Sequence, residues 1–172
     1  NIRNFVKLSR KHNVISADVG IDVQSDRRIP RNERPARLRV VEERPDGLVL
    51  CGAKSCASIG AIAHYSTCAT VFSPDLQEAD AIFCAFPMNA EGLTLLLREP
   101  TVDPNSEAED HPLDSQGEEI DNLLLFDHVF VPNEFIFGYN NKLLLGLYTD
   151  FSVLAFWHTL ARLSYRAEIF AG

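Results

Sequence analysis

Apolar and polar residues follow each other along this chain with two different periods. Between about residues 37 and 98, the apolar residues come in short runs. Runs of this length, rich in branched and aromatic side chains and bounded by Gly, Pro, Asn, Asp or Ser, are typical of β-strands. The runs are 48–51, 68–72, 81–86 and 93–97. They predict an antiparallel barrel or sandwich.

The clearest local pattern in this region is a hairpin. Val40 and Val41 stand between charged neighbours, Pro45, Asp46 and Gly47 supply turn residues, and the next four residues are apolar again. The sequence therefore predicts two antiparallel strands joined by a tight turn.

Two segments have a helical period instead. Phe5 and Leu8 lie at helical spacing in a stretch that ends in cations and is followed by Asn13, which predicts the end of an amphipathic helix. From Leu143 onward, apolar residues recur every three or four positions. This second pattern predicts a long helix that runs toward the end of the chain.

The region before that helix divides into a polar stretch and an apolar one. Residues 99–121 are rich in acids and prolines, which predicts a loop; a connection this long is either functional or mobile. The apolar run that follows ends at Pro132 and predicts one more strand.

Composition is that of an ordinary globular protein. The 172 residues are 46% apolar and 23% charged, which excludes disorder throughout, and the net charge of −8 argues against general nucleic-acid binding. One segment is nevertheless basic, and it either faces an anionic ligand or forms a solvated connector that pairs with the acidic stretch. It contains Arg27, Arg28, Arg31, Arg34, Arg37, Arg39 and Arg44.

The cysteines are expected to be free thiols. Cys51, Cys56, Cys68 and Cys84 lack the paired short spacing of a zinc or iron–sulfur motif, so no metal site is predicted. Neither a secretory signal nor a transmembrane run stands out in the pattern. We therefore expect a cytoplasmic protein without membrane attachment.

Several separated motifs together resemble one enzyme family. They are Asp-Val-Gln-Ser-Asp-Arg at 22–27, the hairpin that begins Arg-Val-Val-Glu-Glu at residue 39, Gly-Ala-Lys at 52–54, and Phe-Asp-His-Val-Phe-Val-Pro-Asn-Glu at 126–134. Their order resembles that of the 4-hydroxyphenylacetate 3-monooxygenase oxygenase family, and the resemblance runs through nearly the whole chain.

This resemblance implies an α+β fold, with an acyl-CoA dehydrogenase-like middle β-barrel domain flanked by parts of N- and C-terminal helical domains. Residues 1–20 would end the first helical domain, 21–138 would form the middle domain and 143–172 would begin the last. Family members are several hundred residues long, so the chain is similar to an interior fragment. Relatives with this fold usually assemble as dimers or tetramers, which implies a homo-oligomer.

The function that the resemblance implies is that of the oxygenase component of a two-component flavin monooxygenase. A separate flavin reductase would supply reduced FAD (FADH2), and the oxygenase would use it with O2 to hydroxylate a small phenolic substrate. The flavin would carry the redox chemistry, while the protein orients the reactants and excludes water. Neither a nucleic acid nor a membrane is implied as a partner, and this segment alone is expected to be inactive.

The resemblance also assigns flavin contacts. Gln24, Ser25, Asp26 and Arg27 correspond to the family's flavin-contacting loop. Ser58 stands where the family usually has a threonine that hydrogen-bonds the flavin ring, so a hydroxyl is retained. Asp26 could equally serve only to cap a turn.

The substrate side contains the main departure from the family. Thr70 and Val71 correspond to the substrate-side loop. Asp18 stands where the family often has a histidine that contacts the phenol, and a carboxylate cannot donate a hydrogen bond unless it is protonated. Asp18 is therefore the candidate catalytic residue, and the substrate or the acid–base role is expected to differ. Val23 replaces a usual proline.

Other functions stay open at this point. A 4-hydroxybutyryl-CoA dehydratase shares the fold and the Gly-Ala-Lys region, but its iron–sulfur cluster needs a cysteine on the last domain's first helix, and no cysteine follows Cys84. An acyl-CoA dehydrogenase-like flavoenzyme and a non-catalytic, flavin-free relative are the further alternatives, and the second is motivated by Asp18.

The histidines have structural interpretations beside functional ones. His64 resembles a histidine of the dehydratases, but a lone histidine beside a strand is more often a structural group. His128 is expected to pair with Asp127. His158 lies in a helix rich in leucine and is expected in the core.

Overall fold

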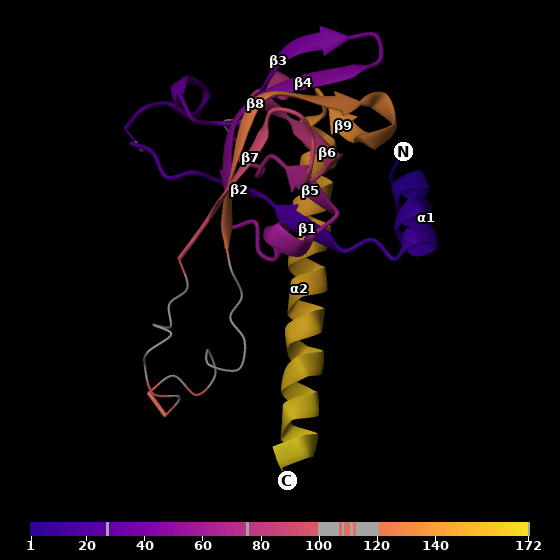
Figure 1. Ribbon diagram of the computed structural model, residues 1–172, viewed down its shortest axis with the longest axis vertical. Helices are drawn as coiled ribbons and strands as arrows, with labels where there is room; N and C mark the ends of the chain where they lie inside the picture. Colours follow the sequence, from indigo (N-terminus) through magenta and orange to yellow (C-terminus); the bar gives the residue numbers. More distant parts are fainter. Residues whose placement is uncertain are drawn as a thin grey trace.

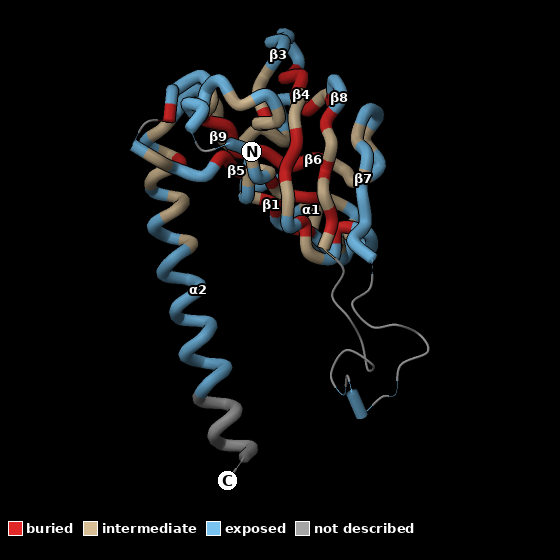
Figure 2. Tube along the Cα trace, turned by 90° about the vertical axis from the view of Figure 1, so that its left-hand side faces the viewer, coloured by how far each residue is buried: buried red, intermediate tan, exposed pale blue. Residues whose placement is uncertain are grey.

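The computed structural model describes residues 1–26, 28–74, 76–99, 107, 109–110, 112 and 121–171; the side chains of residue 31 and of residues beyond 164 lie outside the description. A body of β-strands carries a short helix against one side and a long helix that projects away from it (Figure 1). Most of the buried residues lie in the strands (Figure 2). Of the site residues predicted from the sequence, Arg27 lies outside the described residues.

The first sheet has four strands in the order β1-β5-β6-β9. Its bounds are β1 Ser16–Val19, β5 Tyr65–Ala69, β6 Ile82–Pro87 and β9 Ile136–Tyr139. β1 runs parallel to β5, whereas the β5–β6 and β6–β9 pairs are antiparallel. The N-terminal part of the chain therefore closes one edge of this sheet.

The second sheet has five strands, with β4 and β8 at its centre. The order is β2-β4-β8-β7, and β3 also pairs with β4. The bounds are β2 Ile21–Asp22, β3 Arg39–Arg44, β4 Gly47–Ser55, β7 Leu93–Leu97 and β8 Asn122–Pro132. All of its strand pairs are antiparallel, and the β3–β4 pair is the hairpin predicted from the sequence.

Short 3-10 helices connect the strands. They are η1 Arg31–Glu33, η2 Gly60–Ile62, η3 Glu78–Asp80 and η5 Asn133–Phe135. The strands predicted at 81–86, 93–97 and up to Pro132 are confirmed by β6, β7 and β8. The predicted loop at 99–121 falls mostly outside the described residues.

The described strands form two sheets and not the closed barrel that the resemblance implied. The chain passes from the first sheet to the second at Gly20, between β1 and β2, and β2 is only two residues long. In a closed barrel, every strand pairs with a neighbour on both sides. Here β1 is an edge strand of the first sheet and β2 an edge strand of the second, so the two sheets are not joined into one. Gly20 thus lies where the two sheets meet.

Inward-facing side chains of both sheets form the main core. The alternation of β8 buries Leu124, Phe126, Val129 and Val131 and leaves the residues between them partly or fully exposed. Leu50 of β4 and Cys68, Cys84 and Phe86 of the other sheet pack in the same cluster. Burying this apolar surface is the main stabilising contribution to the fold.

Helix α1 spans Ile2–His12 and ends as predicted. Asn13 has φ 50° and ψ 47°, the left-handed conformation that closes many helices, and cations occupy the last turn. The helix buries Phe5, whose ring contacts the rings of Tyr65, Phe135 and Phe137. This aromatic group fixes α1 against the first sheet.

Helix α2 spans Lys142–Ala171, and only its first turns pack on the body. Leu145 is buried there against Ala69, Leu76 and Phe83, but the side chains of residues 153–164 are exposed (Figure 2). His158, expected in the core, is exposed because the helix has already left the sheets at that point. The segment Lys142–Ser164 is also long and apolar enough to span a membrane by length and composition, which core helices of soluble proteins satisfy as well.

Candidate active site between the first sheet and helix α2

A cavity of about 670 Å³ lies between the β1 and β5 ends and the exposed part of α2. Asp18, Thr70 and Val71, which were predicted separately from the sequence, all line it. The remaining lining residues are Gly20, Ile21, Ala69, Tyr148, Thr149, Ser152, Val153, Phe156 and Trp157. The structure therefore brings the predicted catalytic and substrate-side residues to one place.

Because side chains alternate between the two faces of a strand, the Asp18 side chain points away from the core. Ala17 and Val19 are buried on the core side of β1, so Asp18 between them is exposed at the cavity. Thr67, its register partner on β5, donates its hydroxyl to Oδ1 of Asp18 at 2.6 Å. This hydroxyl uses only part of the acceptor capacity of the carboxylate, so Asp18 keeps a hydrogen-bond acceptor that faces the cavity.

Tyr148 is the principal aromatic group on the opposite wall. Its ring lies 4.4 Å from that of Phe83, centroid to centroid, which fixes the ring on the sheet. Burial raises the pKa of the Tyr148 hydroxyl, the negative charge of Asp18 raises it further, and a hydrogen bond with Ser152 opposes both. The phenolic proton of Tyr148 is therefore retained well above neutral pH.

Thr70 and Val71 contribute to the cavity in different ways. The Thr70 hydroxyl donates to the carbonyl of Asp80 at 2.8 Å, and its backbone N–H donates to the carbonyl of Ile82. This hydroxyl thus anchors the loop that follows β5. Val71 is exposed and presents an apolar surface to the cavity.

A buried ion pair supports this end of the site from below. Lys54 of β4 is 0% exposed, and its ammonium group donates to Oδ1 of Asp22 at 2.6 Å and to the carbonyls of Gly20 and Ala69 at 3.0 and 3.3 Å. It therefore joins β2 to the end of β5 at the cavity's edge. Burial raises the pKa of the neighbouring Cys68 thiol to about 11, although the Lys54 charge opposes this rise.

The predicted flavin loop leaves the sheet directly after β2. Gln24 is exposed and Ser25 is half-buried. Asp26 accepts hydrogen bonds from the side chain and the backbone N–H of Arg28, which lower the pKa of the Asp26 carboxyl. The alternative interpretation of Asp26 as a residue that holds a turn is consistent with this geometry.

Ser58 lies outside the residues that line this cavity. Its hydroxyl donates to Oδ1 of Asp121 at 2.8 Å, next to Asn122 at the start of β8. A hydroxyl oxygen that donates can still accept, so the group keeps one hydrogen-bonding position for a ligand.

The basic segment pairs locally. Arg28 pairs with Asp26, Arg37 with Asp80, and Arg44 with Glu42. The Arg37–Asp80 pair is shielded and ties the segment to η3. These three arginines thus pair with carboxylates outside the acidic stretch, and both the anionic ligand and the solvated connector stay predictions for the segment as a whole.

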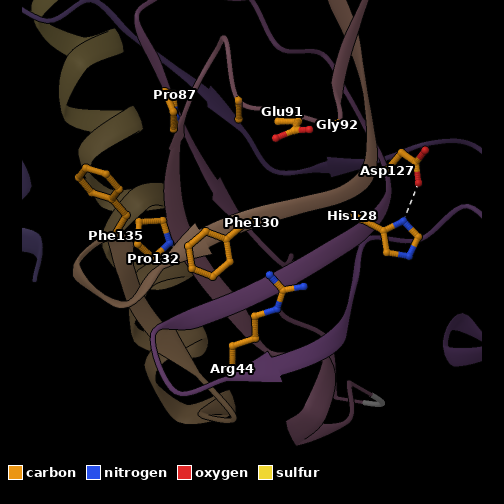
Figure 3. A pocket seen from close by; sticks show the side chains of 10 residues that line it. Arg44, Pro87, Glu91, Gly92, Asp127, His128, Phe130, Pro132 and Phe135 are labelled. Atoms are coloured by element: carbon orange, nitrogen blue, oxygen red, sulfur yellow. Dashed lines mark hydrogen bonds and ion pairs between the residues drawn. The ribbon is translucent and has the colours of Figure 1, made fainter.

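A second cavity of about 670 Å³ lies on another part of the body and is lined by Arg44, Glu91, Asp127, His128 and Phe130 among others (Figure 3). The predicted pairing of His128 with Asp127 is confirmed, since Nδ1 lies 2.7 Å from Oδ1. His64 accepts the backbone N–H of Ile15 at Nδ1, 3.0 Å away, which is a structural role.

The aromatic wall from α2 was not assigned from the sequence. Two rows of residues spaced by four face the cavity, and residues at this spacing share one face of a helix. They are Tyr148, Ser152 and Phe156, and Thr149, Val153 and Trp157. The spacing is visible in the sequence, but the whole segment is apolar, so no single face stands out.

The cavity fits a planar aromatic ligand. Its volume falls within the roughly 300–1,000 Å³ of small-molecule sites. Phe156 and Trp157 are 61% and 63% exposed, and an added Cβ at Gly20 would meet open space. These apolar surfaces and the single carboxylate acceptor suit flat rings bearing a hydroxyl group.

The fold is that of acyl-CoA dehydrogenase-like proteins. A probable acyl-CoA dehydrogenase from Mycobacterium abscessus superposes with a TM-score of 0.56 at 19% identity, over 85% of this chain and 34% of that one. At this level of identity, the likeness concerns the fold alone.

A narrower assignment follows from the family comparison. Residues 1–138 match the family model described as "4-hydroxyphenylacetate 3-hydroxylase N terminal", and the chain belongs to this family. The predicted resemblance is thereby confirmed.

Three relatives show how the chain relates to whole proteins. It is 36% identical over 175 residues to the 2,4,6-trichlorophenol monooxygenase of Cupriavidus pinatubonensis, and 36% identical over 174 residues to the FADH(2)-dependent monooxygenase TftD of Burkholderia cepacia; each match covers 100% of this chain and 33% of the relative. The oxygenase component of 4-hydroxyphenylacetate 3-monooxygenase, solved with FAD and 4-hydroxyphenylacetate, superposes with a TM-score of 0.72 at 29% identity, covering 82% of this chain and 30% of that one. The chain thus spans about a third of the length of the curated relatives it matches.

Proposed function

We propose that the whole protein is the oxygenase component of a two-component flavin monooxygenase that uses reduced FAD and O2 to hydroxylate a phenol. The observation that carries this proposal is the cavity that joins Asp18 to an aromatic wall, in a chain that belongs to the 4-hydroxyphenylacetate 3-hydroxylase family. Relatives named for phenolic substrates, for FADH2 and for FAD support the same class. A separate flavin reductase, a cytoplasmic location and a homo-oligomeric assembly complete the proposal.

FAD would be held mainly by the loop after β2 and by a hydroxyl group that follows the end of β4. The proposed contacts are Gln24, Ser25, Asp26, Arg27 and Ser58. Among the described ones, the exposed Gln24 amide and the accepting position of the Ser58 hydroxyl offer the polar groups that a flavin ring edge requires. When bound, reduced FAD supplies the reaction with dioxygen.

Asp18 is the proposed catalytic residue. The hydroxyl of Thr67 orients the Asp18 carboxylate, which can accept the hydrogen bond of a phenol O–H and take its proton as the ring becomes hydroxylated. A phenolate oxygen donates electron density to the ring and makes its carbon atoms more reactive toward an electrophilic oxygen. Thr70 and Val71 would border the same phenol, and Tyr148 would cover its face.

The first test is a titration of the full-length protein with FADH2 without oxygen, followed by mixing with oxygenated buffer that contains 2,4,6-trichlorophenol. The proposal predicts FADH2 binding and conversion of the phenol only when FADH2 is supplied. Conversion in the complete absence of flavin would overturn it, and a stoichiometric iron–sulfur cluster would favour a dehydratase instead.

The Asp18→Asn variant tests the assigned role separately. Asparagine keeps the shape but cannot take a proton, so we expect FADH2 binding to persist while phenol hydroxylation falls by about 10²–10⁴-fold, the usual range for general acid–base catalysis. Asp46→Asn, on the exposed β3–β4 turn, is the matched control and should retain full activity. Equal rates for both variants would remove Asp18 from the mechanism.

A further inference from the structure

An irregularity in the pairing of β4 with β8 brings three metal-binding side chains together. Leu50 pairs with Val129 and Gly52 pairs with Phe126, so a single residue, Cys51, faces the two residues between them. Those residues are Asp127 and His128. The Cys51 sulfur, an Asp127 carboxylate oxygen and a His128 ring nitrogen all lie within 4.8 Å of one another.

The backbone holds this group in a specific arrangement. The N–H of His128 donates to the Cys51 sulfur at 3.2 Å, and the N–H of Asp127 donates to the carbonyl of Gly92 at 2.9 Å. His128 has φ 56°, a left-handed conformation that is uncommon in a residue other than glycine. Strained backbone of this kind persists where the surrounding structure enforces it, and it clusters at functional sites.

Two of the three side chains are open to solvent. Asp127 is 87% and His128 71% exposed, while Cys51 is half-buried beneath them. Figure 3 shows the Asp127 carboxylate and the His128 ring joined at the margin of the second cavity. An ion arriving from solvent can therefore bind the imidazole nitrogen and the carboxylate in place of the hydrogen bond between them, and it binds Cys51 as a thiolate once the thiol proton is released to solvent.

We propose that Cys51, Asp127 and His128 form a binding site for a divalent transition-metal ion, and specifically for Zn²⁺. Thiolate, imidazole and carboxylate are its usual ligands, and three protein ligands leave the fourth position of a tetrahedral site to water. The thiolate and imidazole disfavour Mg²⁺ and Ca²⁺, which take oxygen ligands. The N–H donor to the sulfur supplies the outer support that metal ligands generally have.

This site is separate from the proposed active site. It shares no residue with the cavity that contains Asp18, and its three ligands all belong to the second sheet. The sequence predicted no metal site because the ligands are not arranged in a short motif: Asp127 and His128 follow Cys51 by more than seventy positions, and only the strand register unites them.

Cobalt titration of the full-length protein, freed of metal by a chelator, tests the proposal directly. Co²⁺ occupies zinc sites and gives a thiolate charge-transfer absorption in the near ultraviolet. We expect this absorption to saturate with one Co²⁺ per chain at this site and to disappear when Zn²⁺ is added. Cys51→Ser should abolish it, and His128→Asn, which keeps a residue type tolerant of the left-handed conformation, should weaken Co²⁺ binding at least 10-fold.

Cys56→Ser is the matched control and should leave the absorption unchanged. Like Cys51, Cys56 is a free thiol that solvent can reach, but it follows β4 and lies outside the cluster. Circular dichroism of each variant shows that the fold is retained. No thiolate absorption with the wild-type protein, absorption that survives Cys51→Ser, or equal losses in Cys51→Ser and Cys56→Ser would each overturn the proposal.

Discussion

Lys54 has no solvent contact, and its ammonium group joins three acceptors from different parts of the fold. Its three acceptors come from β2, the β1–β2 junction and the end of β5. Removing one partner of a buried ion pair leaves the other incompletely compensated. The sequence contained Gly-Ala-Lys as a family motif but no indication that this lysine would be buried.

Lys54→Met is expected to lower the free energy of unfolding by about 3 kcal/mol, because methionine fills the space but removes the ammonium group that donates to Asp22 and to two backbone carbonyls. Urea denaturation followed by circular dichroism measures the change. Arg44→Met is the control: Arg44 pairs with Glu42 in solvent and should have no measurable effect. Similar stability for both variants would show that the buried pair is not a structural requirement.

Cys68 should make the stability depend on pH in the alkaline range. Its pKa is raised from 9.0 to about 11 in the folded protein, mainly by burial. A raised pKa means that the folded state holds the proton more tightly, so this contribution is complete below pH 9 and is lost as the pH rises toward 11. Two pKa units correspond to about 3 kcal/mol at most.

Urea unfolding of the wild type and of Cys68→Ala at pH 8 and pH 10.5 isolates this effect from those of other titrating groups. We expect the wild type to lose more stability between the two pH values than the variant does. Identical losses would mean that the Cys68 thiol does not titrate differently in the folded and unfolded states.

The sequence identified Asp18 as a candidate but not the residues around it. The residue and its departure from the family were visible in the chain. Its donor Thr67 and its neighbour Tyr148 were not, because they lie 49 and 130 positions away and only the β1–β5 pairing and the docking of α2 bring them together.

At the scale of elements, alternation and turn residues were enough to predict several parts of the fold. These are the β3–β4 hairpin, the end of α1, and strands β6 to β8. β1 was not predicted, because four residues carry too little periodicity, and its partner β5 is parallel and distant in the chain. The irregularity in β8 is reflected in its burial pattern. Buried residues alternate up to 126 and again from 129 to 131, but two consecutive exposed residues, Asp127 and His128, interrupt the alternation. Apolar residues at 123, 125 and 130 obscured it.

Two glycines of this region should respond differently to the same substitution. Gly52 has φ +131°, and a Cβ there would lie 2.3 Å from the Arg37 carbonyl oxygen, so Gly52→Ala should cost about 3 kcal/mol or more of stability. Gly20→Ala meets open space and should leave stability nearly unchanged. Thermal unfolding of both variants is the measurement, and a stable Gly52→Ala protein would contradict the strand geometry described for β4.

At the scale of the whole molecule, the described part of α2 exposes many large apolar side chains. Large side chains such as Leu147, Phe151 and Leu154 are mostly exposed along this helix (Figure 2). Apolar patches of this extent normally mark contacts with other protein segments or with membranes. The relatives are about three times as long as this chain. In a protein of that length, additional segments could supply such contacts.

The 172-residue segment on its own is therefore expected to self-associate and to bind an apolar dye, and to have no hydroxylase activity. Gel filtration of this segment and of a Leu147→Gln, Phe151→Gln, Leu154→Gln variant tests this, since the polar side chains should shift it toward the monomer. A monomeric unaltered segment that binds no dye would show that α2 covers its own apolar surface.

The docking of α1 has a consequence for the time course of synthesis. The Asn1 side chain donates to the carbonyls of Asn133 and Ile136, and Phe5 packs on Phe135 and Phe137. Helix α1 thus leaves the ribosome before its partners, which are made some 130 residues later. At about 5–20 residues per second this interval is on the order of 10 s, long enough for a chaperone to bind the exposed Phe5 side of the helix.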